Sequence, residues 1–140
     1  NDDRIISREV RLQMNASNRA RVVEEELNAE QWKGLLGKCV LFVGSRMHAA
    51  IGAVSQKVPT ILIAYNHKAY GIFSEMLGLG ELVIDIKQLA KGTLQQDLIR
   101  KTSYLVESTV DFNRRADSVL YEASKKALLN FSEYHDPTRR

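Results

Sequence analysis

The stretch CVLFVGSRMHAAIGAVSQKVPTILIAY, residues 39–65, decides which fold the sequence predicts. It contains two short apolar runs, 39–44 and 58–65, that are rich in β-branched and aromatic residues. Continuous apolar runs of this length are typical of strands that are covered on both faces. The small residues of 46–56 between the two runs are compatible with a helix, so the stretch predicts a strand, a helix and a second strand.

The residues that follow repeat this pattern. Residues 68–80 predict a helix that ends at glycines, and ELVIDI, residues 81–86, is a third apolar run. Strands and helices that alternate at such short spacing are typical of right-handed parallel crossovers in a doubly wound sheet. We therefore expect an α/β fold, with a Rossmann-like parallel sheet and flanking helices, over residues 1–92.

The segment that precedes the first apolar run is less regular. Residues 2–14 show a rough helical stripe of apolar side chains, and residues 21–28 predict a short strand at Val22-Val23 before an acidic run. Asn28 is a suitable N-cap for a short helix that Gly37 ends.

The C-terminal part of the chain has a different character. Residues 93–134 contain no glycine or proline and repeat apolar residues at helical spacing. This predicts a separate helical segment of two helices, or one bent helix, with a break near residues 111–115. Residues 135–140 are expected to form a frayed tail.

The composition is that of an ordinary soluble globular chain. Of the 140 residues, 44% are hydrophobic, and 20 Lys and Arg against 17 Asp and Glu give a net charge of +3. The basic pairs are interleaved with acids and lack aromatic neighbours, so we expect no nucleic-acid partner. The opening NDDRIISREV is helix-like and lacks a signal-peptide pattern, which favours a piece of a longer protein.

Cysteine and motif content narrow the expected chemistry. The single cysteine, Cys39, adjoins an apolar run and is expected to be a small buried hydrophobe in a reducing, cytoplasmic compartment. The sequence has no metal-ligand cluster with usable spacing, no P-loop and no dinucleotide fingerprint, so we expect neither a metal nor a cofactor.

Positive and titratable side chains gather where the first two apolar runs end. Gly44-Ser45-Arg46 follow the first run, and Tyr65-Asn66-His67-Lys68 follow the second. Ligands of open parallel sheets bind outside the carboxyl ends of the strands, so we expect these two loops to face one pocket. The start of the helix near residue 47 adds N–H groups that favour an anion.

Each of these side chains also has a plainer explanation. Arg46 could pair with a surface acid, but an arginine at a helix start opposes the helix dipole unless an anion binds there. His48 could be a core histidine, Lys68 a surface lysine with a buried stem, and His67 an ordinary loop residue. Ser45 could act only as an N-cap. Tyr65 and Tyr70 could be packing residues with polar tips. Glu75 and Asp85 are candidates for a general base, but they could equally be residues of a helix face and a strand end.

Three motifs together resemble the C-terminal domain of the polysaccharide pyruvyl transferase family. They are G-S-R-x-H-A-x-I-x-A at Gly44–Ala53, V-P-T at Val58–Thr60, and Y-x-x-K-x-x-G at Tyr65, Lys68 and Gly71. The likeness extends over about residues 1–90. It implies that this chain is the C-terminal lobe of a two-lobed protein similar to GT-B glycosyltransferases, followed by C-terminal helices, with the N-terminal lobe of the same protein as its partner.

The resemblance also implies an activity. Family members transfer an enolpyruvyl-derived group from phosphoenolpyruvate to two hydroxyls of a sugar, which gives a cyclic pyruvate ketal and phosphate. His48 and Lys68 match donor-site positions and Arg46 matches the motif arginine. We expect His48 as the catalytic acid, with anion binding as its alternative role. The substrate contacts are expected from Arg46, Lys68, Ser45, Gly44, Tyr65 and His67. The acceptor is a sugar of a cell-surface polysaccharide or its lipid-linked precursor, which places the protein in the cytoplasm at the inner face of the membrane. Alone, this part is expected to be inactive.

Two other functions remain open at this stage. The same strand-end cations could hold a nucleotide diphosphate in a glycosyltransferase or sugar-nucleotide epimerase lobe. The chain could also be a non-catalytic interaction fragment whose helices over 93–134 contact a partner, the other lobe or the membrane.

Overall fold

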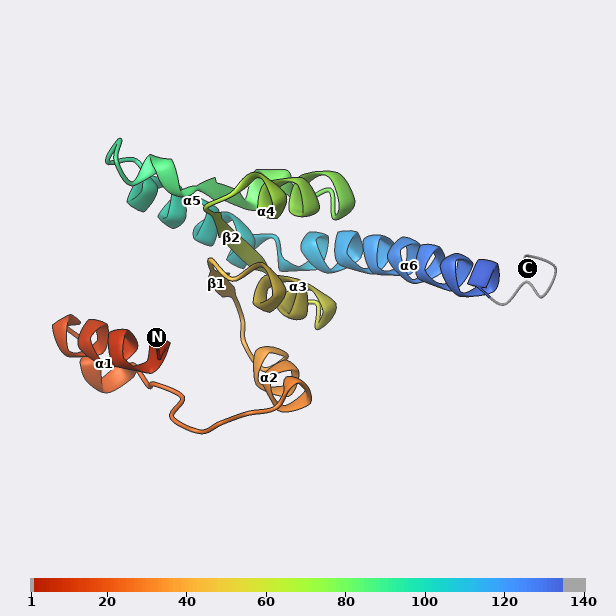
Figure 1. Cartoon of the computed structure of the whole chain (residues 1–140). Helices are drawn as coiled ribbons and strands as arrows, with labels where there is room; N and C mark the ends of the chain where they lie inside the picture. The colour runs from red at the N-terminus through yellow and green to blue at the C-terminus, as the bar shows by residue number, and fades with distance from the viewer. Residues whose placement is uncertain (1, 135–140) are drawn as a thin grey trace. The chain divides into compact units, whose positions relative to one another are not determined.

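A computed structural model describes residues 2–134, and these fall into two compact units that divide after Gln31 (Figure 1). The tail expected at 135–140 lies outside the described residues. Each unit is considered separately below.

The larger unit contains a three-stranded parallel sheet. Strands β1 (Phe42–Gly44), β2 (Thr60–Ala64) and β3 (Val83–Asp85) pair in the order β1-β2-β3. Gly44 lies opposite Leu62, and Leu62 lies opposite Val83. The predicted α/β class and the parallel sheet are confirmed. Within the described residues the strand order runs without the reversal of a doubly wound sheet.

The central strand β2 carries the core of this unit. Thr60, Ile61 and Leu62 are fully buried, and the Thr60 hydroxyl donates a hydrogen bond to the Val58 carbonyl at 2.7 Å. That bond satisfies the buried polar group of the strand. The predicted strand over 58–65 is therefore confirmed, with its pairing confined to the five residues of β2.

Four helices surround the sheet. Helix α3 (Met47–Ser55) contacts β1 and β2, and α4 (His67–Gly71) continues into a π-helical turn at Ile72–Met76. Helix α5 (Leu94–Glu107) contacts β2 and β3, and α6 (Thr109–Tyr134) contacts α3. One core unites these elements; beside the residues of β2 it includes Ala50, Val54, Phe73, Leu82, Ile84, Leu105, Phe112 and Ala116.

The edge strand β1 differs from its prediction. Its pairing covers three residues instead of the whole run 39–44, and Val43 is 40% exposed, so the strand is not covered on both faces. Val40 is 74% exposed. Cys39 is exposed as well, and the expectation of a buried cysteine is wrong. The reason is positional, because the run meets a strand partner on one side only and joins the sheet only at Phe42.

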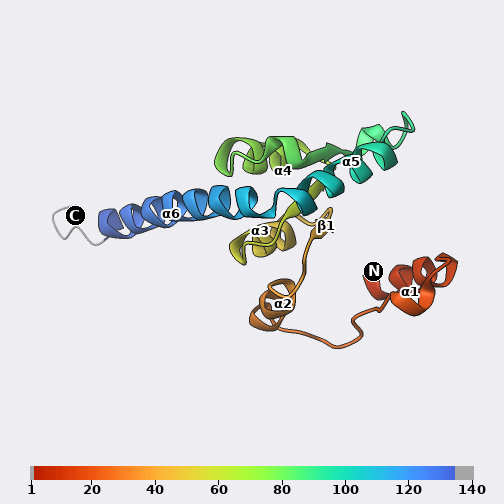
Figure 2. The same cartoon turned by 180° about the vertical axis from the view of Figure 1, so that it is seen from behind.

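The two C-terminal helices were predicted, but the break lies earlier than expected. It falls at Ser108, which has φ −112° and ψ 28°, instead of near 111–115. The Thr109 hydroxyl donates to the Leu105 carbonyl at 3.0 Å, and side-chain bonds of this type compete with the helical backbone pattern. Beyond the buried Ala116, the later turns of α6 project away from the sheet, and residues 121–129 are exposed (Figures 1 and 2).

The smaller unit is built on α1 (Asp3–Gln13), which the apolar stripe predicted. The expected strand at Val22-Val23 is wrong, since residues 20–28 have no regular secondary structure. Two arginines of α1 bind this segment instead. Arg4 donates to the Glu24 carbonyl at 2.9 Å, and Arg8 Nε donates to Glu24 Oε1 at 2.9 Å.

Helix α2 (Ala29–Leu36) begins as the sequence predicted. The Asn28 side chain accepts from the Gln31 N–H, and the Gln31 side chain accepts from the Asn28 N–H, both at 2.9 Å. This reciprocal pair is a capping box, which satisfies two backbone donors at the helix start.

Over residues 2–134, the chain has no helix with both the length and the apolar character that a membrane crossing requires.

Arg115 joins α6 to the loop that leads into β3. Its guanidinium donates to the Gly78 carbonyl at 2.7 Å and pairs with Glu81 Oε1 at 2.6 Å, and Lys101 of α5 also donates to the Glu81 carbonyl. The bond to Glu81 raises the pKa of Arg115, whereas burial lowers the pKa of Lys101. These contacts attach the loop that leads into β3 to both C-terminal helices.

We expect Arg115→Met to lower the free energy of unfolding by about 1–2 kcal/mol, because a charge-assisted hydrogen bond and a half-exposed ion pair are lost together. The matched control is Arg114→Met. The Arg114 side chain is 79% exposed, and its Nη1 lies 3.9 Å from Asp111 Oδ1, so this ion pair is long and solvated. It should cost less than about 0.5 kcal/mol. Urea unfolding of both variants measures the difference, and equal losses would contradict the role given to Arg115.

The arginines of the smaller unit make its contacts sensitive to acid. The hydrogen bond from Arg8 lowers the pKa of Glu24, and the hydrogen bonds from Arg4 lower the pKa of Asp2. A lowered folded-state pKa means that the attraction is complete above the unfolded-state pKa and is lost as the pH falls through the folded-state value. NMR titration should find Glu24 titrating below its ordinary value of 4.5, and Arg8→Gln should return it toward that value. An unchanged Glu24 titration in Arg8→Gln would refute the pairing.

Candidate functional site

The carboxyl ends of the three strands lie at one edge of the sheet, because all three are parallel. Ser45 and Arg46 follow β1, Tyr65 and Asn66 follow β2, and residues 86–87 follow β3. This is the edge at which the sequence placed the site. It is also where open parallel sheets bind their ligands.

Arg46 lies at the start of α3. It occupies the N-cap position with φ −83° and ψ 110°, and no side chain caps the first turn of this helix. Ser45 precedes this position, so the alternative in which Ser45 is the N-cap is wrong. The first N–H groups of α3 therefore point toward the edge without a side-chain acceptor, beside an exposed arginine.

His48 and Lys68 occupy equivalent places on two helices that follow successive strands. Each is the second residue of its helix, His48 in α3 and Lys68 in α4, and both are exposed. Exposure excludes the core explanation of His48. The structure thus carries Arg46, His48 and Lys68 at the same edge, and their individual roles stay predictions.

Gly44 has a packing reason for lacking a side chain. A Cβ built on Gly44 would lie 2.6 Å from Cζ of Phe42. Residues two apart in a strand share one face, so the Phe42 ring occupies the space that a larger residue would need. Gly44 therefore leaves room for the Phe42 ring at the end of β1, and this packing role does not depend on a ligand.

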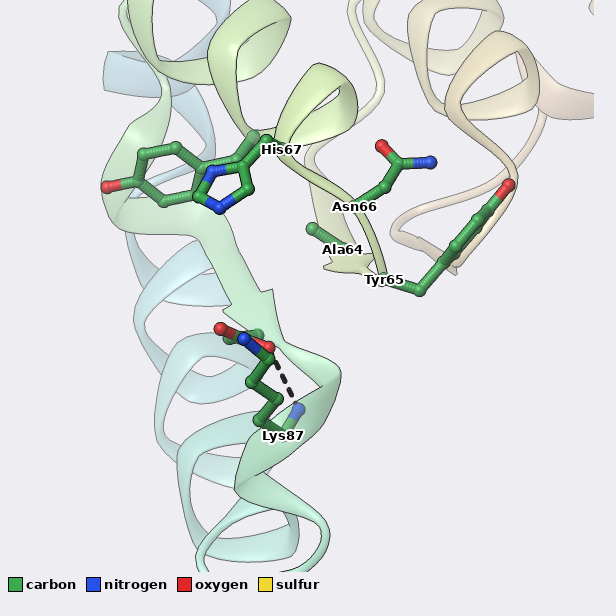
Figure 3. Close-up of a pocket in the computed structure, with 7 residues that line it drawn as sticks. Ala64, Tyr65, Asn66, His67 and Lys87 are labelled. Carbon is green, nitrogen blue, oxygen red and sulfur yellow. Dashed lines mark hydrogen bonds between the residues drawn. The ribbon is translucent and has the colours of Figure 1, made fainter.

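A pocket of about 310 Å³ opens at the ends of β2 and β3 (Figure 3). It is lined by Ala64, Tyr65, Asn66, His67, Tyr70, Asp85 and Lys87. Its wall combines aromatic rings with an imidazole, an amide, a carboxylate and an ammonium group. Pockets of this size with a few oriented polar groups are typical of small-molecule sites.

Two hydrogen bonds fix the polar groups of this pocket. Asn66 Oδ1 accepts from the Ala69 N–H at 2.8 Å, which makes Asn66 the N-cap of α4. Asp85 Oδ1 accepts from the Lys87 N–H at 2.9 Å, as the dashed line in Figure 3 shows. The side chains of Tyr65 and His67 extend to different sides of the loop between β2 and α4.

The pocket gathers part of the predicted site and adds to it. Tyr65 and His67 were predicted and line the pocket, whereas Gly44, Ser45, Arg46, His48 and Lys68 lie outside its lining. The sequence reasoning missed four lining groups as site residues: Asn66, Tyr70, Asp85 and Lys87. The sequence contained a signal for two of these residues, because Asp85 and Lys87 lie at the end of the third apolar run, where a predicted strand ends.

Comparison with known proteins supports the resemblance that the sequence motifs indicate. The model of the polysaccharide pyruvyl transferase family matches residues 1–67, which include β1, α3 and β2. This match and the relative described next support the likeness to the polysaccharide pyruvyl transferase family. The amylovoran biosynthesis protein AmsJ of Erwinia amylovora is 32% identical over 93 residues, which are 66% of this chain and 22% of AmsJ. No solved structure matches.

The chain therefore spans about a fifth of the length of its curated relative. The pyruvyl transferase match contains Gly44, Ser45, Arg46, His48, Tyr65 and His67, and it ends one residue before Lys68. Asp85 and Lys87 lie beyond the matched segment, so their place in the pocket is known from the structure alone.

The Asn66 cap gives a direct test of how the pocket loop is held. Asn66→Ala should lower the free energy of unfolding by about 1 kcal/mol, because the Ala69 N–H loses its acceptor. Asn66→Ser keeps an oxygen acceptor at the cap and should retain most of that stability. Chemical denaturation compares the two variants, and an equal loss in both would show that the cap contributes little.

Proposed function

We propose that this chain is part of an enzyme that transfers a pyruvyl group from phosphoenolpyruvate to a sugar during polysaccharide synthesis. The match to the pyruvyl transferase family over residues 1–67 supports a transferase of this kind. The relative from Erwinia amylovora is named for amylovoran biosynthesis, which supports the link with a polysaccharide. The observation that carries the proposal is the group of exposed basic side chains, Arg46, His48 and Lys68, at one edge of the parallel sheet.

The donor suits these groups. Phosphoenolpyruvate carries a phosphate and a carboxylate, so its site needs fixed cations and oriented N–H donors. Arg46 offers a planar guanidinium, which can hold a carboxylate or phosphate with two parallel hydrogen bonds. Lys68 supplies a point charge, and the uncapped first turn of α3 adds backbone donors. No metal or other cofactor enters this proposal.

His48 is the proposed general acid. Its imidazolium gives a proton to the methylene carbon of phosphoenolpyruvate, and the electron pair of the carbon–carbon double bond forms the new C–H bond. C2 becomes oxocarbenium-like, and a sugar hydroxyl attacks it and releases its proton. The C2–O bond to phosphate then breaks with its electron pair, and the second hydroxyl closes the ketal. One released proton restores His48, and the other leaves with phosphate.

The proposal also includes a second lobe and a cellular location. In the proposal, the described sheet belongs to the C-terminal lobe of a GT-B-like protein, and the N-terminal lobe of the same protein closes the active site. The fragment alone is inactive for that reason. The acceptor is a sugar that can be lipid-linked, so the protein works in the cytoplasm at the inner face of the membrane.

The test is phosphate release from phosphoenolpyruvate by the full-length protein, across a panel of sugar acceptors. His48→Gln should lower kcat by about 10²–10⁴-fold, which is the usual contribution of a general acid. Arg46→Ala and Lys68→Ala should each raise the KM for phosphoenolpyruvate about tenfold or more, because a charge-assisted contact is lost.

The control is Lys126→Ala, an exposed lysine in the projecting part of α6, which should leave both constants unchanged. If His48→Gln keeps most of the turnover while Lys68→Ala abolishes it, His48 is not the acid. Tight binding of UDP-sugars with no binding of phosphoenolpyruvate would assign the lobe to glycosyl transfer instead.

A further inference from the structure

We infer that the pocket at the ends of β2 and β3 binds the acceptor sugar, with the Asp85 carboxylate accepting hydrogen bonds from its hydroxyls. This inference rests on the proposed function, because it concerns the second substrate of the same reaction. The pocket has a volume of about 310 Å³, at the small end of the usual range for ligand sites and suited to a single sugar ring.

Charge distinguishes this pocket from the proposed donor site. Asp85 and Lys87 place one carboxylate and one ammonium group in the wall, whereas the cations proposed for the donor, Arg46 and Lys68, lie outside the lining. A ligand with phosphate and carboxylate groups would meet like charge at Asp85, which is unfavourable at short range. A neutral, polyhydroxylated ring meets no such repulsion. Its hydroxyls donate to a carboxylate, which is the strongest acceptor that a side chain offers.

The Asp85 carboxylate is held in place before any ligand arrives. Asp85 is the last residue of β3, and its Oδ1 accepts from the Lys87 N–H at 2.9 Å. An ionised carboxylate has about four acceptor sites, so this one bond leaves capacity for sugar hydroxyls. The Lys87 side chain lines the same pocket and adds donors for ring or hydroxyl oxygens.

Aromatic side chains complete the match to a sugar. His67 and Tyr70 are three residues apart in α4, a spacing that places side chains on one side of a helix. Tyr70 is 49% exposed although its ring lines a pocket, so the ring is available to a ligand. The C–H face of a pyranose packs on such rings, and the tyrosine hydroxyl keeps a polar contact at its tip.

The position of the pocket also fits the reaction. The first residue of α4, His67, lines the pocket, and the next residue, Lys68, belongs to the proposed donor site. Two adjacent residues therefore connect the two sites. A sugar in the pocket would present its hydroxyls next to the donor, as attack on C2 requires.

The test uses steady-state kinetics of the full-length protein, with the acceptor and phosphoenolpyruvate varied separately. Asp85→Asn keeps an oxygen for the Lys87 N–H but replaces a carboxylate acceptor, so the fold should persist. We expect the KM for the acceptor to rise about tenfold or more, with the KM for phosphoenolpyruvate within about twofold of its original value. Tyr70→Leu, which removes the flat ring, should act in the same direction. The matched control is Glu122→Gln, an exposed acid on α6.

A rise in the KM for phosphoenolpyruvate without a change for the acceptor would overturn the inference and leave the proposed function intact. Unchanged constants in both pocket variants would overturn it as well. If the unsubstituted protein releases no phosphate from phosphoenolpyruvate, the proposed function fails. The pocket is then tested alone, by saturation-transfer NMR with methyl glycosides of galactose, glucose and mannose. Binding that Asp85→Asn abolishes supports a sugar site, and no binding of any of the three rejects it.

Discussion

The hydrogen-bonded pairing of β2 with a parallel strand on each side is the interaction on which the rest of this structure depends. β2 is short, and most of its side chains are buried against the preceding helix α3 and against α5, which comes from a distant part of the chain. Parallel strands need a crossover between them, so each strand ends at the same edge and a helix begins just beyond it. The loops after β1, β2 and β3 become neighbours for this reason alone.

The loops at this edge differ in charge, and in the proposed reaction this difference suits two different substrates. The loops after β1 and β2 carry Arg46 and Lys68, which suit an anionic donor. The end of β3 carries Asp85, which suits a neutral acceptor. An enzyme that joins a dianionic molecule to a sugar needs both environments side by side, because one uniformly positive site would not discriminate between the substrates. The match to the pyruvyl transferase family ends at residue 67, so it covers the first environment more fully than the second.

Sequence reasoning succeeded where a local pattern coincides with burial. The run over 58–65 gave a correct strand because its residues lie at the centre of the sheet, and the capping box at Asn28 and Gln31 gave a correct helix start. It failed where the pattern depends on a partner. The Val22-Val23 pair has strand propensity but no strand beside it, and the arginines of α1 bind that segment instead. Cys39 adjoins an apolar run but lies outside the paired part of β1.

By itself, the sequence determined the alternation of strands and helices, the parallel sheet and the motifs that resemble the family, because periodicity and motif spacing are properties of neighbouring residues. It also placed Arg46, His48 and Lys68 after strands. Only the tertiary structure decided which side chains share a pocket. Asp85 and Lys87 stand about twenty residues from His67 along the chain, and the pairing of β3 beside β2 brings them together. That pairing is a long-range contact, which no local pattern in the sequence contains.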